Sequence, residues 1–241
     1  MRFACCTVAL AACALLVRAH TVPTFDLPGS LELVDRPPNA TPVEAMVLGL
    51  HPLIRDDEIQ AWPDRDGKFV LKKVKPGRYS LTLPFPGRIR TFAIGSRELA
   101  PDGFELNSSD VGSLRIIASL KTSTVSVKVR GLPILTSSAV ALMSPADPYL
   151  TLRESCISSA LTEPRTTFKY VPLGKYRILI VDEKFQSDVA AYAPRFPAFL
   201  KDEGTTVEAS DKADKEVTAT YVDGATIQRA IRDAGHLFGK P

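Results

Sequence analysis

The chain has 241 residues, of which 45% are hydrophobic and 24% charged, and its formal net charge is +3 at pH 7. A charge this close to balance argues against a dedicated nucleic-acid binder, which would show a clustered basic face. Three of the four cysteines, Cys5, Cys6 and Cys13, lie within the first 19 residues, so Cys156 remains alone; this excludes an internal disulfide in the rest of the chain and a cysteine-rich zinc site.

Residues 1–19 have the composition of a signal peptide. Met1-Arg2 is a short basic start, and residues 3–17 are apolar or small. We expect cleavage after Ala19 and an extracytoplasmic protein in the periplasm, at the cell surface or secreted. The apolar run is shorter than the roughly 20 residues that span a bilayer, so we expect no transmembrane segment. An alternative is lipidation, because Leu10-Ala11-Ala12-Cys13 has the form of a bacterial lipobox in which Cys13 is acylated.

Short strands are predicted between residues 23 and 88, where large residues alternate with a period of two. The expected strands lie at 31–34, 43–50, 69–74 and 79–83, and a tight turn is expected at 63–67. Asp, Gly and Pro favour such turns because they tolerate or fix the backbone angles required. We therefore expect residues 23–88 to form a first sandwich module, with its boundary to the next module near residues 84–93.

The same rhythm continues through residues 89–222, which we expect to form a second sandwich region. Its predicted strands lie at 89–94, 114–120, 124–129, 139–143, 167–170, 175–181, 205–209 and 216–221. Residues 190–204 interrupt this rhythm as a long excursion. Strands with turn signals every 8–12 residues are typical of all-β sandwiches.

The tail, residues 223–241, is predicted to contain one amphipathic helix. Five apolar residues recur at helical spacing, namely Ile227, Ala230, Ile231, Ala234 and Phe238. They follow Asp223 and Thr226, either of which is a suitable helix cap. We expect this helix to pack on the second module; a partner-binding or frayed end is the alternative.

Two stretches of the chain are variants of one phrase. Residues 67–83 read GKFVLKKVKPGRYSLTL, and residues 165–181 read RTTFKYVPLGKYRILIV. Aligned on their glycines, they match Val74 with Val171, Tyr79 with Tyr176 and Leu81 with Ile178. A repeat of this length indicates two related modules rather than one enzyme core.

The phrase Val74-Lys75-Pro76-Gly77-Arg78-Tyr79, preceded by Asp66-Gly67-Lys68-Phe69, resembles the carboxypeptidase regulatory-like domain family. The second copy keeps Gly174 and Tyr176 but has its proline one place early, at Pro172, and lacks the Asp-Gly entry. The resemblance implies a transthyretin-like or starch-binding-like sandwich in a secreted bacterial protein. Such modules are accessory and lack the catalytic zinc domain. The expected fold is therefore all-β, with two tandem Ig- or transthyretin-like antiparallel β-sandwich modules and a short C-terminal helix.

Residues with catalytic chemistry are few and lack patterned partners. The three histidines, His20, His51 and His236, include no pair at metal-ligand spacing, and no His-Glu-x-x-His motif occurs. Asp64 and Asp66 resemble part of a calcium loop but are followed by Lys68 and Phe69, so a turn is favoured. We predict no enzyme, no catalytic residue, no metal and no cofactor.

Loop aromatics are the candidate ligand-binding residues. Trp62, the only tryptophan, stands beside a proline, and Tyr192, Phe196 and Phe199 fall within the excursion. Aromatic planes stack on the apolar faces of sugars, but such rings also cover the ends of a sandwich as minor cores. The leading hypothesis is a structural or protein-interaction module at the cell envelope, whose partner is an envelope or extracellular protein. The second is a carbohydrate-binding module whose partner is a polysaccharide.

Overall fold

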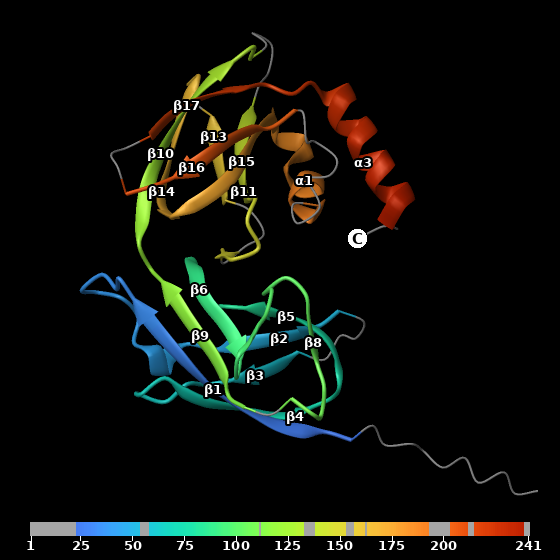
Figure 1. Cartoon of the computed structure of the whole chain (residues 1–241). Coiled ribbons are helices and arrows are strands. Elements are labelled where there is room, and N and C mark those ends of the chain that lie inside the picture. The colour runs from blue at the N-terminus through green and yellow to red at the C-terminus, as the bar shows by residue number, and fades with distance from the viewer. Residues whose placement is uncertain are drawn as a thin grey trace, which may run out of the picture.

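The computed structural model describes residues 23–53, 58–110, 112–132, 138–152, 157–161, 163–192, 203–211 and 215–238. Two β-rich modules follow one another along the chain, and Figure 1 shows them stacked, with the first below and the second above. The predicted leader, residues 1–19, lies outside the described residues. No helix among the described residues is long and apolar enough to cross a membrane.

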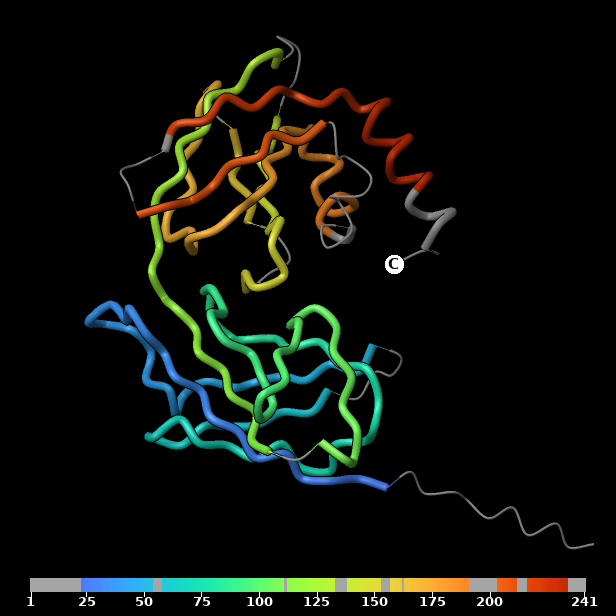
Figure 2. The backbone as a smooth tube through the Cα atoms, viewed as in Figure 1, coloured from blue at the N-terminus to red at the C-terminus, as the bar shows by residue number. Residues whose placement is uncertain are grey.

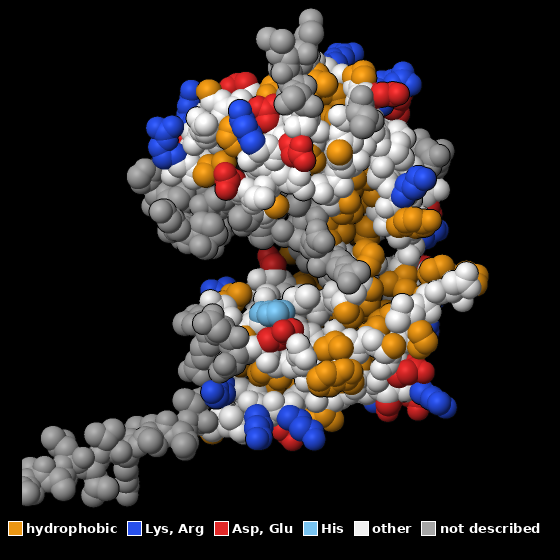
Figure 3. Space-filling model, turned by 180° about the vertical axis from the view of Figure 1, so that it is seen from behind, with side chains coloured by type: hydrophobic (Ala, Val, Ile, Leu, Met, Phe, Trp, Pro, Cys, Tyr) orange, Lys and Arg blue, Asp and Glu red, His pale blue; other side chains and the backbone are white. Residues whose placement is uncertain are grey.

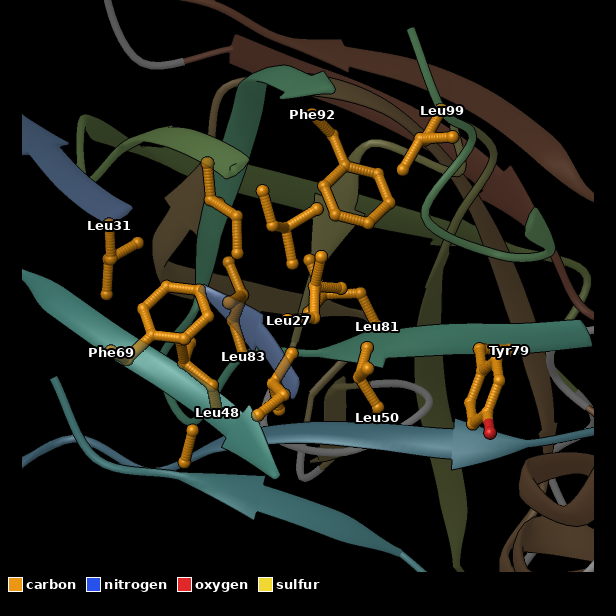
Figure 4. Packing of buried hydrophobic residues seen from close by; sticks show 14 of the residues in the cluster. Leu27, Leu31, Leu48, Leu50, Phe69, Tyr79, Leu81, Leu83, Phe92 and Leu99 are labelled. Carbon is orange, nitrogen blue, oxygen red and sulfur yellow. The ribbon is translucent and has the colours of Figure 1, made fainter. Parts of the chain in front are cut away.

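The first module consists of two sheets. One contains β1 (Phe25–Val34), β4 (Lys68–Val74), β6 (Gly87–Ile94), β7 (Arg97–Glu98) and β9 (Leu114–Ser119). The other contains β2 (Leu48–Pro52), β3 (Ile59–Ala61), β5 (Gly77–Thr82) and β8 (Phe104–Leu106). Their strand orders are β6-β9-β1-β4 and β3-β2-β5-β8. The core lies between the sheets, where Figure 4 shows buried leucines of β1, β2 and β5 together with Phe69, Tyr79 and Phe92.

The second module repeats this arrangement. Its three-stranded sheet contains β10 (Thr122–Arg130), β14 (Arg165–Pro172) and β17 (Lys215–Thr220). Its four-stranded sheet contains β11 (Ala139–Pro145), β13 (Ile157–Leu161), β15 (Gly174–Asp182) and β16 (Thr205–Ala209). The orders β14-β10-β17 and β13-β11-β15-β16 correspond to β4-β1-β9 and β3-β2-β5-β8. The repeated phrase thus marks a repeated topology, as predicted.

Each module departs from a purely antiparallel sandwich by one parallel strand pair. β1 pairs in parallel with β9, and β10 pairs in parallel with β17. The first and last strands of a module therefore run side by side in the same direction. Figure 2 shows the consequence: the backbone passes from β9 into β10 without a long linker.

The strand pairing groups residues 87–119 with the first module. β6 and β9 extend the sheet that contains β1, and β8 pairs with β5. Residues 84–93, where we expected the boundary, contain the start of β6. We propose that the modules meet at residues 120–121, between β9 and β10, because hydrogen-bonding partners rather than strand spacing define a module.

Two segments differ in structure from the predictions. Residues 43–50 do not form one strand: Val43–Ala45 is a 3-10 turn, in which Ala45 N–H bonds to Pro42, and β2 begins only at Leu48. After β15, the chain forms a 3-10 turn (Glu183–Phe185) and helix α1 (Gln186–Tyr192), where the first module has β6. The predicted excursion therefore begins with a helix.

The C-terminal helix α3 (Gly224–Phe238) is present and packs on the second module, as predicted. Asp223 is its cap, because its carboxylate accepts hydrogen bonds from the backbone N–H groups of Ala225 and Thr226 and from the Thr226 hydroxyl. These bonds, led by that of the hydroxyl, hold the pKa of Asp223 below its usual value. Ile227 is fully buried in a cluster between α3, α1 and the outer face of the β11–β15 sheet.

Candidate binding surface between the two modules

Of the aromatic residues predicted as ligand contacts, only Trp62 has a side chain among the described residues. Trp62 follows β3 and is 60% exposed. Tyr192 is the last residue of α1, and its side chain lies outside the described residues, as do Phe196 and Phe199. Trp62 lines neither of the two pockets described below.

The modules are joined by a short strand that crosses from one to the other. β12 (Leu150–Thr151) belongs to the second module by sequence but pairs antiparallel with β6, so it extends a sheet of the first. Two adjacent side chains of this segment pack in different cores. Tyr149 packs against the hydrophobic core of the first module, and Leu150 is buried in the core of the second. β12 thus adds a strand to the edge of a sheet of the first module.

Hydrogen bonds hold this crossing strand in place. The buried Thr151 hydroxyl faces the carbonyl oxygens of Phe85 and Gly87, at 3.2 and 3.1 Å, and donates between them. The N–H of Ile89 bonds to the carbonyl of Tyr149 at 2.8 Å. These contacts attach the second module to the first at β6. They are a second connection, in addition to the direct run of the chain from β9 into β10.

Two ion pairs and a backbone bond flank the crossing strand. Arg88 lies 3.2 Å from Asp147, and Lys121 lies 3.0 Å from Asp211. The N–H of Leu173 bonds to the carbonyl of Lys121 at 3.3 Å. Most of these side chains are well exposed, so their pairing adds little free energy by itself and mainly orients the modules.

An apolar pocket of about 290 Å³ lies at this junction. Figure 3 shows hydrophobic side chains gathered on the rear face between the modules. None of the described residues that line the pocket is charged, and they come from the loop after β1, the loop before β6, the β9–β10 connection and β14. The lining residues are Pro37, Ala40, Thr41, Ala45, Met46, Pro84, Phe85, Pro86, Leu120, Thr122 and Tyr170. We call this the junction pocket.

Tyr170 is the most exposed large hydrophobic residue described, at 76%. It has a φ of 57°, and its equivalent in the first module, Lys73, has a φ of 56°. Each lies beside a register shift, opposite Ser123–Val125 for Tyr170 and opposite Phe25–Leu27 for Lys73. The positive φ therefore belongs to a bulge that both modules share. The two positions differ in their side chains. The second module has the aromatic ring of Tyr170, which lines the pocket, and the first has the ammonium group of Lys73.

A second pocket, of about 400 Å³, is lined mainly by β6 together with Glu98 and Tyr149. Its two arginines already have acidic partners: Arg88 pairs with Asp147 and Arg90 with Asp35. Because both guanidinium groups are already neutralised by these carboxylates, the pocket has no unpaired arginine to attract an anion. We therefore regard the junction pocket as the better candidate site.

The residues considered for catalysis or metal binding have structural partners where they are described. Asp64 accepts the N–H groups of Asp66 and Lys68, at 2.9 and 2.8 Å, as a turn residue does. His51 pairs with Glu58 at 3.3 Å, while the Ser80 hydroxyl bonds to the His51 carbonyl rather than to its ring. Among the described residues, no three His, Cys, Asp or Glu side chains are grouped as metal ligands.

No family model matches the chain, and no curated protein matches it. Among solved structures, the minor pilin GBS52 of Streptococcus agalactiae is 11% identical, and the match covers 80% of this chain and 94% of the pilin, with a TM-score of 0.36. The major pilin T-13 of Streptococcus pyogenes is 12% identical, with coverage of 84% and 98% and a TM-score of 0.23. The major pilin BcpA of Bacillus cereus is 8% identical, with coverage of 82% and 98% and a TM-score of 0.23. At these TM-scores, the proposals below rest on the chain's own contacts.

Sequence reasoning missed Tyr170 and the junction pocket. The available signal was the repeat itself, which aligns Tyr170 with Lys73 and so places an aromatic residue where the other copy has a solvated one. No pattern in the sequence could have predicted the pocket, because residues that are far apart in the chain, from residue 37 to residue 170, form its wall.

Proposed function

We propose that this chain is a non-catalytic, extracytoplasmic protein-interaction module of the cell envelope. The observation that carries the proposal is the junction pocket, an uncharged, apolar hollow with an exposed tyrosine at its edge. Tyrosine is among the residues that dominate binding energy at protein interfaces, since it offers a large rigid surface with one polar group.

The contacts between the modules favour a preformed site. The crossing strand, its buried threonine and the continuous β9–β10 run all restrict relative movement. A site assembled before binding loses less conformational freedom when its partner arrives, so the same contacts give a higher affinity. The carboxypeptidase regulatory-like resemblance and the predicted leader agree with an accessory role outside the cytoplasm.

A photo-crosslinking amino acid in place of Tyr170, in cells that produce the whole chain, tests this function. We expect a discrete crosslinked product with an envelope or extracellular protein. The matched control carries the same group in place of Val70, a 45% exposed residue on β4. Equal products from both positions, or none from position 170, would reject the junction pocket as an interaction site.

Carbohydrate binding remains the second candidate because Trp62 is 60% exposed, as a sugar-stacking ring must be. A titration with soluble polysaccharides, followed by tryptophan fluorescence, tests it directly. A saturable shift that disappears in Trp62→Ala would favour this function, whereas silence in fluorescence and calorimetry would count against it.

A further inference from the structure

We infer that the junction pocket binds an extended, uncharged peptide segment that contains proline. This inference deepens the proposed function, on which it rests. The first argument is charge: none of the eleven described lining residues is an Asp, Glu, Lys, Arg or His. A charged partner would lose its hydration without gaining an opposite charge in return.

The second argument is hydrogen bonding. The wall includes Pro37, Pro84 and Pro86, which have no N–H group, so these three positions cannot donate to a peptide added as a β-strand. The polar side chains of the wall are hydroxyls, from Thr41, Thr122 and Tyr170. Within the described part of the chain, these three hydroxyls make no hydrogen bond, so they can donate to a ligand. A run of prolines in the polyproline II conformation offers carbonyl acceptors and no N–H donors, which matches such a wall.

The third argument is shape and size. A volume of about 290 Å³ is at the lower end for small-molecule sites, which begin near 300 Å³, and suits a short segment better than a large cofactor. Tyr170 presents an open ring, and proline-rich segments bind grooves lined by aromatic side chains. Their backbone is already extended in the free state, so binding costs little conformational entropy.

The test is a titration of the whole chain, without its leader, with capped octaproline, followed by calorimetry and by amide chemical shifts. We expect saturable binding that shifts amides around Leu120–Thr122 and weakens by about tenfold or more in Tyr170→Ala, as for a tyrosine that dominates an interface. Tyr170→Phe retains the ring and should keep most of the affinity. Lys73→Ala, at the equivalent bulge of the first module, is the matched control and should bind like the parent chain.

Capped Gly-Ser peptide of equal length and maltoheptaose complete the panel. Absence of saturable octaproline binding to the correctly folded chain would overturn the inference, as would binding that Tyr170→Ala leaves unchanged. Maltoheptaose binding that depends on Tyr170 would also overturn it, in favour of a sugar site. A specific crosslink from position 170 together with no octaproline binding would reject only this inference and leave the proposed function standing.

Discussion

Tyr79 and Tyr176 occupy equivalent positions in the two modules and make the same hydrogen bond. Each hydroxyl donates to the carbonyl four residues upstream, that of Lys75 at 2.7 Å and that of Pro172 at 2.8 Å. Each bond closes the turn between the two strands of the repeated phrase, in the manner of the tyrosine corner of β-sandwich proteins. The tyrosine is therefore repeated because the turn requires its hydroxyl.

Tyr176→Phe should lower the free energy of unfolding by about 1–3 kcal/mol, because it leaves a buried carbonyl without its donor. Tyr79→Phe should have a smaller effect, about 1 kcal/mol, since its bond is only part-buried and water can replace the hydroxyl. Urea denaturation with an unchanged m-value measures both. Equal losses in the two variants would contradict the difference in burial.

Gly174→Ala should disturb the junction between the modules, whereas Gly77→Ala should not. Both glycines have a similar φ, 154° and 157°, so the backbone strain of the substitution is the same. An added Cβ at Gly174 would lie 2.8 Å from the Leu150 side chain, on the crossing strand; at Gly77 the nearest atom is at 3.9 Å. We expect Gly174→Ala to cost about 1–3 kcal/mol more, from overpacking.

The measurement for this pair is thermal unfolding combined with hydrogen exchange at Leu150 and Thr151. Faster exchange of the Leu150 and Thr151 amides in Gly174→Ala, but not in Gly77→Ala, would confirm that the steric clash with Leu150 loosens the crossing strand. Identical exchange in both variants would show that β12 does not depend on this contact.

Ile227→Ala should release helix α3 from the second module. Ile227 is fully buried against the outer face of the β11–β15 sheet, so its truncation should cost about 2–4 kcal/mol. Arg229→Ala, at an exposed position of the same helix, is the control for helix propensity and should change stability little. Hydrogen exchange in α3 distinguishes release of the helix from general unfolding, and protection retained in Ile227→Ala would refute this packing role.

Stability should fall at alkaline pH between about pH 10 and pH 12. Burial, and next the hydrogen bond that its hydroxyl donates to Asp182, raise the pKa of Tyr221 from 10.0 to about 12. The folded chain therefore holds this proton where the unfolded chain has lost it, so the stabilisation is complete below pH 10 and disappears as pH rises through the folded pKa. Burial likewise raises the pKa of Tyr176.

Urea unfolding at a series of pH values measures this slope, and tyrosinate absorbance reports the ionisation itself. Tyr221→Phe should flatten the dependence, because it removes one of the two described tyrosines whose pKa is raised. An unchanged slope in that variant would mean that Tyr221 ionises alike in the folded and unfolded chains.

The sequence alone determined the repeat and those local elements whose pattern lies within one short window. Period-two alternation in residues 69–74 and 175–181 reports that one side of each strand is buried, and Asp64 and Gly67 report a turn because few other residues adopt its angles. Asp223 could be recognised as a helix cap because its carboxylate bonds to groups only two and three residues away. Such interactions are local, so a single window of sequence contains both partners.

The tertiary structure alone decided which strands share a sheet. Alternation at 89–94 is the same whether β6 pairs with β9 or begins a second module, because hydrogen-bonding partners distant in sequence leave no mark on a strand's own pattern. The two-residue strand β12 is too short for any periodicity, and its pairing depends on Gly87 and Thr151 meeting across the junction. The junction pocket exists for the same reason: its wall forms only when segments from both modules are brought together in space.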